Sequence, residues 1–430
     1  MKYSDGFGRI VKWVFFICLL MMPMLAYAQI TDWQALAQQA IETDPRVLSA
    51  RANLSARSFD VKGAQAAYYP TLSGKGYFGS TDNDDPLVRD GEKHTWGVEL
   101  EQPVPLFGKE SAKVKNAKAA LRGEVALLNK IEQDVASDFF GTALRLRTAL
   151  KIFQFHEHLV SLLSEQLIAF EESVDLGGAH LPELRHAQSR LAQSISYKEQ
   201  AEVDVTLQRA SMRRLLAGRP IPPPMTENEF DLLQTLTPKN YDIAVKTAAS
   251  FSPALLKARA ELSRAAAEEA EAKSNYWPDL SINIQTEHGR FDERSMDTWG
   301  AFVSLNQPIF TGGAISAKAN SATHKKRAAI ESLRQETIML EERINAIWLR
   351  WKAYGKSVKY WIRAEKEEKK ALTFIKEQVD KGVGTLITFM KAQEDWTNIR
   401  SKGVEKRLER DLTWVSLLKE IGILQTFRPY

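Results

Sequence analysis

Val98-Glu99-Leu100-Glu101-Gln102-Pro103 is followed 205 residues later by Val303-Ser304-Leu305-Asn306-Gln307-Pro308, which has the same ending and the same spacing of valine and leucine. Three further pairs share this offset: Ser111-Ala112-Lys113 with Ser316-Ala317-Lys318, Val174-Asp175-Leu176-Gly177 with Val379-Asp380-Lys381-Gly382, and Ala187-Gln188 with Ala392-Gln393. Upstream, Asp44-Pro45 and Tyr69-Pro70 return as Ser252-Pro253 and Trp277-Pro278, 208 residues later. Matched blocks in the same order indicate a tandem duplication.

A proline-rich stretch, Gly218-Arg219-Pro220-Ile221-Pro222-Pro223-Pro224, separates the two copies. Consecutive prolines fix φ and remove backbone donors, so this stretch is predicted to be extended. We therefore expect a first repeat over 29–218, a linker over 219–240 and a second repeat over 241–430.

The hydrophobic period changes twice within each repeat. Residues 33–68 and 241–276 read as helix and end at aromatic-proline pairs, where a helix should stop. Alternating segments then predict strand hairpins at about 71–103 and 279–308. We expect polar loops over 81–93 and 288–297 to join the strands of each hairpin.

A long helix is predicted next in both copies. In the second copy, apolar residues step by four and three through Leu340, Ile344, Ile347, Trp351, Tyr354, Val358 and Trp361. A 3.5-residue repeat requires supercoiled packing on other helices. One helix from Lys109 to Glu172 would be roughly 95 Å long, which exceeds a globular domain. The predicted fold is therefore mainly α with a small β part: a duplicated helix, strand hairpin, long coiled-coil helix and return helix.

The first 28 residues have the pattern of a signal peptide. Lys2, Arg9 and Lys12 are basic, an apolar run of about 12 residues follows, and Ala26-Tyr27-Ala28 places Ala26 and Ala28 where signal peptidase cleaves. About 12 residues of helix span only ~18 Å, too short for a bilayer core. Cys18, the only cysteine, lies in this segment, so the mature chain is expected to have no disulfide.

Charge and motifs favour neither nucleic acid nor catalysis. The 58 basic and 54 acidic residues nearly balance at a net charge of +4, so no nucleic-acid partner is predicted. His156 and His158 point in different directions on a helix, and His180 and His186 flank a proline, so no metal site or other cofactor is expected. Trp348, Trp351 and Trp361 are interpreted as core packing. We expect no enzymatic activity.

Four short strands cannot close a membrane barrel, because the smallest such barrels have eight. Strands that enter a membrane must therefore be pooled between subunits, as eight from two copies or twelve from three. Six aromatic residues near the expected strand ends suit a girdle at the membrane interface: Tyr68, Tyr69, Trp96, Tyr276, Trp277 and Trp299. A soluble hairpin on a coiled-coil protein is the alternative.

The signal peptide, the duplicated unit, the paired Gln-Pro strand ends and the paired Val-Asp-x-Gly turns resemble the TolC-type outer-membrane efflux proteins over essentially the whole mature chain. The resemblance implies a homotrimer with a twelve-strand barrel in outer-membrane lipid and a long periplasmic helical tunnel. It also implies a periplasmic adaptor and an inner-membrane pump of the RND or ABC type. The segment 102–109 is similar to members that serve metal-exporting pumps, but small molecules and secreted polypeptides remain possible cargo.

The same resemblance implies the functional positions at the tunnel tip. Glycine turns would dock on the adaptor, through Asp175, Gly177, Gly178, Asp380, Gly382 and Gly384. Where relatives carry acidic gate residues this chain has Thr388 and Lys391, and the first-repeat counterparts are Glu183 and His186. We expect Glu183, with Lys391 as an opposite charge, to set the gate. The alternative function is a structural coiled-coil envelope protein or an adaptor without a pore.

Overall fold

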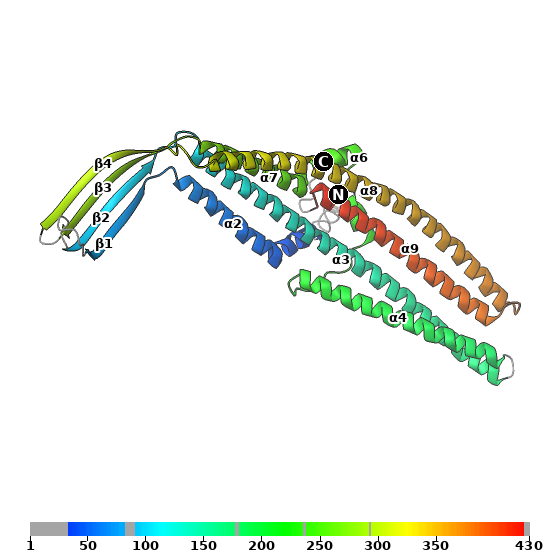
Figure 1. Ribbon diagram of the computed structural model, residues 1–430. Helices are drawn as coiled ribbons and strands as arrows, with labels where there is room; N and C mark the ends of the chain where they lie inside the picture. The colour runs from blue at the N-terminus through cyan, green and yellow to red at the C-terminus, as the bar shows by residue number, and fades with distance from the viewer. Residues whose placement is uncertain (1–32, 82–90, 177–179, 235–237, 292–293, 425–430) are drawn as a thin grey trace, which may run out of the picture. The chain divides into compact units, whose positions relative to one another are not determined.

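The computed structural model in Figure 1 describes residues 33–81, 91–176, 180–234, 238–291 and 294–424. Contacts divide the chain into two compact units. The strand unit comprises Ser49–Leu128 and Pro253–Ile338, and the helical unit comprises Met1–Leu48, Asn129–Ser252 and Met339–Tyr430. The predicted fold class, mainly helix with four strands in two hairpins, is confirmed.

The strand unit contains one antiparallel sheet whose strands follow chain order, as Figure 1 shows. Its members are β1 (Thr71–Thr81), β2 (Gly91–Pro103), β3 (Asp279–Phe291) and β4 (Arg294–Asn306). The two hairpins meet where β2 pairs with β3, and Leu100 lies opposite Ile284. β1 and β4 are therefore the edges, and each leaves a row of backbone groups unpaired within the described residues of one chain.

The second hairpin has a shorter loop than the sequence predicted. The expected loop over 288–297 is mostly strand, and His288 and Asp297 are paired across β3 and β4. Their side chains meet with 3.0 Å between Nδ1 and Oδ1. The prediction was wrong because strands pair through backbone hydrogen bonds, which need no apolar side chains. Where both faces of the paired strands are polar, the sequence shows no alternation of apolar and polar residues. In the first hairpin, β2 likewise begins at Gly91, inside the expected loop 81–93.

The repeated Gln-Pro pair closes the junction between helix and strand in both copies. Helices α2 (Pro45–Ala66) and α7 (Pro253–Ser274) end just before β1 and β3. Gln102 Nε2 donates to the Tyr68 carbonyl over 3.2 Å, and Gln307 Nε2 donates to the Tyr276 carbonyl over 3.4 Å. These amides satisfy carbonyls that the ended helices leave without a partner.

A charged cluster joins α7 to the long helix α8 (Ala314–Asp380) in the strand unit. Glu269 is 8% exposed and accepts from Lys273 at 2.7 Å and from Thr323 at 3.1 Å. Its other oxygen lies 2.8 Å from Lys326 Nζ. Hydrogen bonds from Lys273 and Lys326 lower the pKa of Glu269 to about 2.

Two long helices with return helices form most of the helical unit. The long helices α3 (Lys109–Asp175) and α8 have 67 residues each, and both contribute residues to both units. The return helices are α4 (Leu181–Leu215) and α9 (Leu386–Ile421). The predicted duplication of long helix and return helix is thus confirmed. None of the helices in the described residues is long and apolar enough to span a bilayer.

Prolines divide the helices that precede each strand hairpin. Residues 33–43 are helical, Asp44 interrupts the helix, and Pro45 begins α2. In the second copy α6 (Tyr241–Phe251) stops before Ser252, and Pro253 begins α7. Proline lacks the amide that would continue the earlier helix, but it is accepted in the first turn of the next. The single helices predicted over 33–68 and 241–276 are therefore each two.

The region expected to be linker contains a helix that the sequence analysis missed. α5 (Glu227–Gln234) starts with a capping box, because Thr226 Oγ1 accepts from the Glu229 amide at 3.2 Å while Glu229 Oε2 accepts from the Thr226 amide at 2.6 Å. Phe230 is 1% exposed and packs on Trp414 with 5.2 Å between ring centroids. The Thr-x-x-Glu pattern was a readable signal for this helix.

A buried ion pair lies beside that contact. Arg147 Nη2 on α3 is 2.7 Å from Asp411 Oδ2 on α9, and Asp411 is 1% exposed. Burial raises the pKa of Asp411, while Arg410 and Arg147 oppose the rise. The pair fixes α3 against α9 in the core of the helical unit, where removing one partner would leave a buried charge.

Candidate functional site

The return helices α4 and α9 begin with different caps at corresponding places in the two repeats. Pro182 occupies the first turn of α4, where its missing amide costs nothing. Thr385 caps α9, because its Oγ1 accepts from the Thr388 amide at 3.3 Å. Its hydroxyl also lies 2.9 Å from the Thr388 hydroxyl. Both starts are thus fixed locally, next to the turns that end α3 and α8.

An apolar cluster packs the starts of α4 and α9 on the last turns of α3. Its buried members are Leu159, Leu163, Phe170, Leu184, Ala187 and Met390, and partly buried side chains surround them. Ala187 and Met390 are each 0% exposed and come from different repeats. The cluster therefore brings the two return helices together at this end of the helical unit.

One ion pair connects α4 to α9 about one turn beyond this cluster. Arg190 Nη1 lies 2.5 Å from Glu394 Oε2, and the side chains are 27% and 20% exposed. Burial raises the pKa of Glu394 above the ordinary value, and the charge of Arg190 opposes that rise. The sequence gives no signal for this pair, because the two residues are 204 positions apart and neither belongs to a known motif.

The four expected gate residues lie in the first two turns of α4 and α9. Glu183 is partly exposed, whereas His186, Thr388 and Lys391 are exposed. Within the described residues of one chain, Glu183 and Lys391 do not form an ion pair with each other. Their side chains therefore remain available to groups outside the protomer.

The turns that precede these helices expose apolar side chains. Asp175 ends α3 and Asp380 ends α8, and both are exposed. Leu176 is 87% exposed and Val383 is 81% exposed. Gly382 has φ of 73°, a left-handed conformation that favours glycine.

The neighbouring Gly384 is tightly packed, because a Cβ there would come within 3.1 Å of the Val379 side chain. The expected turn residues Gly177 and Gly178, like the expected cleavage residues Ala26 and Ala28, lie outside the described residues.

The six expected interface aromatics are all exposed in the protomer, but they do not all lie at strand ends. Tyr68, Tyr69, Tyr276 and Trp277 lie between helix and strand, as expected. Trp96 and Trp299 lie inside β2 and β4, because these strands begin earlier than predicted. The placement of the two tryptophans at strand ends was therefore wrong.

Strand register sorts the sheet into a mostly apolar face and a mostly polar face. Residues that are paired across neighbouring strands point to the same side of the sheet. The pairs Leu72 with Leu100 and Ile282 with Val303 therefore place their apolar side chains on one face. That face carries Leu72, Trp96, Val98, Leu100, Ile282, Ile284, Trp299, Val303 and Leu305. The opposite face has an ion pair between Lys75 and Glu99 and a hydrogen bond from Asn283 to Ser304. Two aromatic side chains, Tyr77 and Phe302, also lie on this face.

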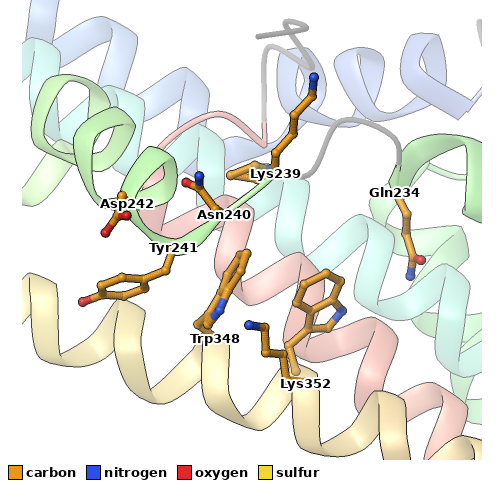
Figure 2. Close-up of a pocket in the computed structure, with 9 residues that line it drawn as sticks. Gln234, Lys239, Asn240, Tyr241, Asp242, Trp348 and Lys352 are labelled. Carbon is orange, nitrogen blue, oxygen red and sulfur yellow. The ribbon is translucent and has the colours of Figure 1, made fainter.

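A surface cavity of about 640 Å³ lies in the helical unit, between α8 and the start of α6. Figure 2 draws the residues that line it. Trp348 and Trp351 line it with 5.4 Å between ring centroids, and Lys352 Nζ lies 5.2 Å from the Trp348 ring. Trp348 is only 6% exposed, which agrees with the interpretation as packing, although it also lines the cavity. Asp242 is in the first turn of α6, where the helix dipole favours a negative charge.

The described residues contain no group of three or more side chains suited to hold a metal ion. His156 is 8% exposed and stacks near Tyr197 at 5.9 Å, and burial lowers its pKa. His180 directly precedes α4 and His186 is exposed on that helix.

Comparison with known proteins identifies relatives over almost the whole chain. The family model for outer membrane efflux proteins matches residues 36–218 and 244–422. The chain is 20% identical over 373 residues to the solvent efflux pump outer membrane protein SrpC of Pseudomonas putida, covering 83% of this chain and 78% of the relative.

Two solved structures have the same fold. CusC, described for its transmembrane channel formation, matches with a TM-score of 0.81 at 14% identity and covers 90% of this chain and 91% of its own. The outer membrane protein VceC of Vibrio cholerae matches with a TM-score of 0.79 at 15% identity and covers 92% of this chain and 96% of its own.

Proposed function

This chain belongs to the outer membrane efflux protein family, and from that premise we propose that it is the passive exit duct of a tripartite export system. Channels of the family are homotrimers that work with periplasmic adaptors and inner-membrane pumps of the RND or ABC type. The duct would release cargo that the pump drives through the adaptor. The proposal includes no chemical step, so no reacting group is needed.

The two-faced sheet is the observation that carries this proposal. Its strands have 11 to 13 residues, enough for a transmembrane strand of about 9–11 residues. In membrane barrels the apolar face meets lipid and the polar face lines the lumen. Three chains joined from the β4 edge to the next β1 edge would leave no strand unpaired.

A proposed gate lies where each long helix is followed by its return helix. The apolar cluster and the pair of Arg190 with Glu394 hold α4 beside α9. Glu183 lies in the first turn of α4 and Lys391 in the second turn of α9. Around a threefold axis, these side chains would form rings of opposite charge that narrow the tip and control conduction.

The tip turns are proposed to dock on the adaptor. Leu176 and Val383 are exposed apolar side chains on turns between long helices. Single exposed apolar side chains are common on protein surfaces. Here, however, the corresponding turns of both repeats each expose an apolar side chain. A trimer would present six such turns in a ring, which suits contact with the apolar tips of partner helices.

The division of the precursor is also proposed, from the signal-peptide pattern and from the duplication. Residues 1–28 would be removed on export, and residues 29–218 and 241–430 would form the two repeats around the linker 219–240.

We propose that the pump, not the duct, selects the cargo. The relatives include a solvent efflux protein, while segment 102–109 is similar to metal-exporting members.

Cysteine cross-linking combined with single-channel recording tests the proposed duct. The mature chain has no cysteine, so Ser73→Cys on β1 and Ser304→Cys on β4 can be introduced without background reaction. A flexible bismaleimide should yield dimers and trimers only from the double variant, and the purified protein should give discrete conductance steps in planar bilayers. A monomer without conductance would instead support a structural coiled-coil protein.

A further inference from the structure

Three lysines surround one cavity of about 690 Å³ in the strand unit. Lys62 comes from α2, and Lys115 and Lys118 come from α3. All three are exposed, and none forms an ion pair with a described residue. Lys62 Nζ lies 4.8 Å from the Phe59 ring, so its nearest recorded partner is aromatic rather than acidic. The cavity therefore gathers three positive charges without a carboxylate among its lining residues.

Two tyrosines, a serine and Gln65 complete the polar lining. Tyr68 and Tyr69 are 37% and 68% exposed and directly precede the proline before β1, while Ser111 lies in the first turn of α3. Tyrosine rings with one apolar side and one hydroxyl favour the boundary between lipid and water. The cavity thus lies beside the place where the first strand begins.

The second repeat shows that the fold does not require these lysines. At the corresponding offsets of 208 and 205, Lys62, Lys115 and Lys118 become Ala270, Asn320 and Thr323. Tyr68 and Ser111 instead keep their identities as Tyr276 and Ser316. The nearby lysines of the second repeat, Lys273 and Lys326, both form ion pairs with Glu269. Among the described residues, the second repeat therefore has no counterpart to the three lysines of this cavity.

We propose that this cavity binds the phosphate of an anionic phospholipid at the periplasmic surface of the outer membrane. Ammonium groups and tyrosine hydroxyls donate to non-bridging phosphate oxygens, and charged donors make the stronger hydrogen bonds. Basic pockets beside membrane segments bind anionic headgroups in this way. The site rests on the proposed function, because only a membrane-inserted sheet places the start of β1 at the headgroup layer.

Binding should respond to charge and salt. Each lysine near an anionic headgroup strengthens binding several-fold, so loss of all three should weaken it about tenfold or more. Raising salt from about 0.05 M to about 0.5 M should weaken binding to the native cavity, because exposed charges are screened. The three-substitution variant should lose most of this salt dependence.

The duplication provides the variant for the test. Lys62→Ala, Lys115→Asn and Lys118→Thr together install residues that the second repeat already carries at these positions. The matched control removes three exposed lysines of α8 in the same way: Lys356→Ala, Lys359→Asn and Lys376→Thr. Native mass spectrometry of the detergent-purified full-length protein would count bound dioleoyl phosphatidylglycerol, with dioleoyl phosphatidylcholine and inorganic phosphate as comparison probes.

The proposal expects phosphatidylglycerol to bind the native protein and the control about tenfold more tightly than the triple variant. Equal binding to the triple variant and the control would overturn the site. Equal binding of phosphatidylcholine, or complete displacement by millimolar inorganic phosphate, would overturn the assignment to an anionic lipid.

Measuring single-channel conductance distinguishes a failure of the lipid site from a failure of the proposed duct. The triple variant should retain native single-channel conductance, because the cavity only anchors the protein in the headgroup layer. If the native protein itself gives no conductance, the proposed duct fails whatever the lipid measurements show. Normal conductance in every variant without any difference in lipid binding overturns the lipid site alone.

Discussion

Arg190 on α4 donates from Nη1 to Oε2 of Glu394 on α9 across 2.5 Å, and both side chains are largely covered. Because the helices come from different repeats, this pair joins the two copies close to the proposed gate. Arg190→Ala would leave Glu394 partly buried without its cation. We expect the local free energy of opening to fall by about 2 kcal/mol. Amide hydrogen exchange in the first turns of α4 and α9 would measure the change.

The double substitution Arg190→Met and Glu394→Met is the control for that prediction. It replaces the ion pair with apolar side chains of similar length and leaves no unpaired charge, so protection should recover most of the loss. If the double variant exchanges as fast as Arg190→Ala, the pair does not hold the helices together.

Glu183→Ala and Lys391→Ala should each raise the open probability of the reconstituted channel. The proposed gate depends on attraction between these charges in the assembled tip, so loss of either one weakens it. The double variant should add little, because both single changes remove the same interaction. Asp204→Ala, an exposed acid further along α4, should leave conduction unchanged. Native conductance and gating in both single variants would count against this gate.

Glu269 should make the strand unit sensitive to acid. Its pKa in the folded protein is lowered to about 2 from an ordinary 4.5, so the unfolded chain takes up a proton more readily. The stabilisation is therefore complete above about pH 4.5 and is lost as the pH falls towards 2. Glu269→Gln should lower the free energy of unfolding by about 2 kcal/mol at pH 7 and have a smaller effect at pH 3.

Glu268→Gln is the matched control for Glu269, since Glu268 has only a 3.9 Å contact to Arg264. It should change stability by less than about 0.5 kcal/mol at either pH. Thermal unfolding followed by circular dichroism at the two pH values would compare the variants. A similar loss for both glutamines would mean that the cluster around Glu269 has no special role.

Period and repetition were sufficient to predict the main elements. The 3.5-residue pattern through Leu340 and Ile344 predicted the long helix, and both residues are buried. The matched Gln102 and Gln307 marked both strand hairpins, because each amide makes the same bond to a helix end. Duplication strengthens such signals, because a pattern that occurs at the same place in both repeats is less probable by chance.

Other features left no periodic signal in the sequence. The outer parts of β3 and β4 are polar on both faces, so His288 and Asp297 were read as loop although they are paired. The link between Arg190 and Glu394 depends on how two distant helices pack, which no local pattern encodes. The cavity lined by Lys62, Lys115 and Lys118 also depends on α2 lying beside α3, which the three lysines do not reveal in the sequence.

Leu176→Asp and Val383→Asp should uncouple the duct from its adaptor without closing it. These side chains are 87% and 81% exposed in the protomer, so folding should tolerate the change. A carboxylate in an apolar docking contact would be desolvated without a partner, which disfavours binding by several kcal/mol. We expect native single-channel conductance from each purified variant and loss of export in cells.

Photo-cross-linking in the native envelope would measure the docking directly. A benzophenone amino acid at position 383 should cross-link to a periplasmic helical-hairpin protein, and Leu176→Asp in the same chain should reduce the yield. Val383→Leu should keep export, because it preserves an apolar contact of similar size. Ser189→Asp adds the same charge on the exposed surface of α4 and should also keep export. Normal export by Leu176→Asp and Val383→Asp would show that the adaptor binds elsewhere.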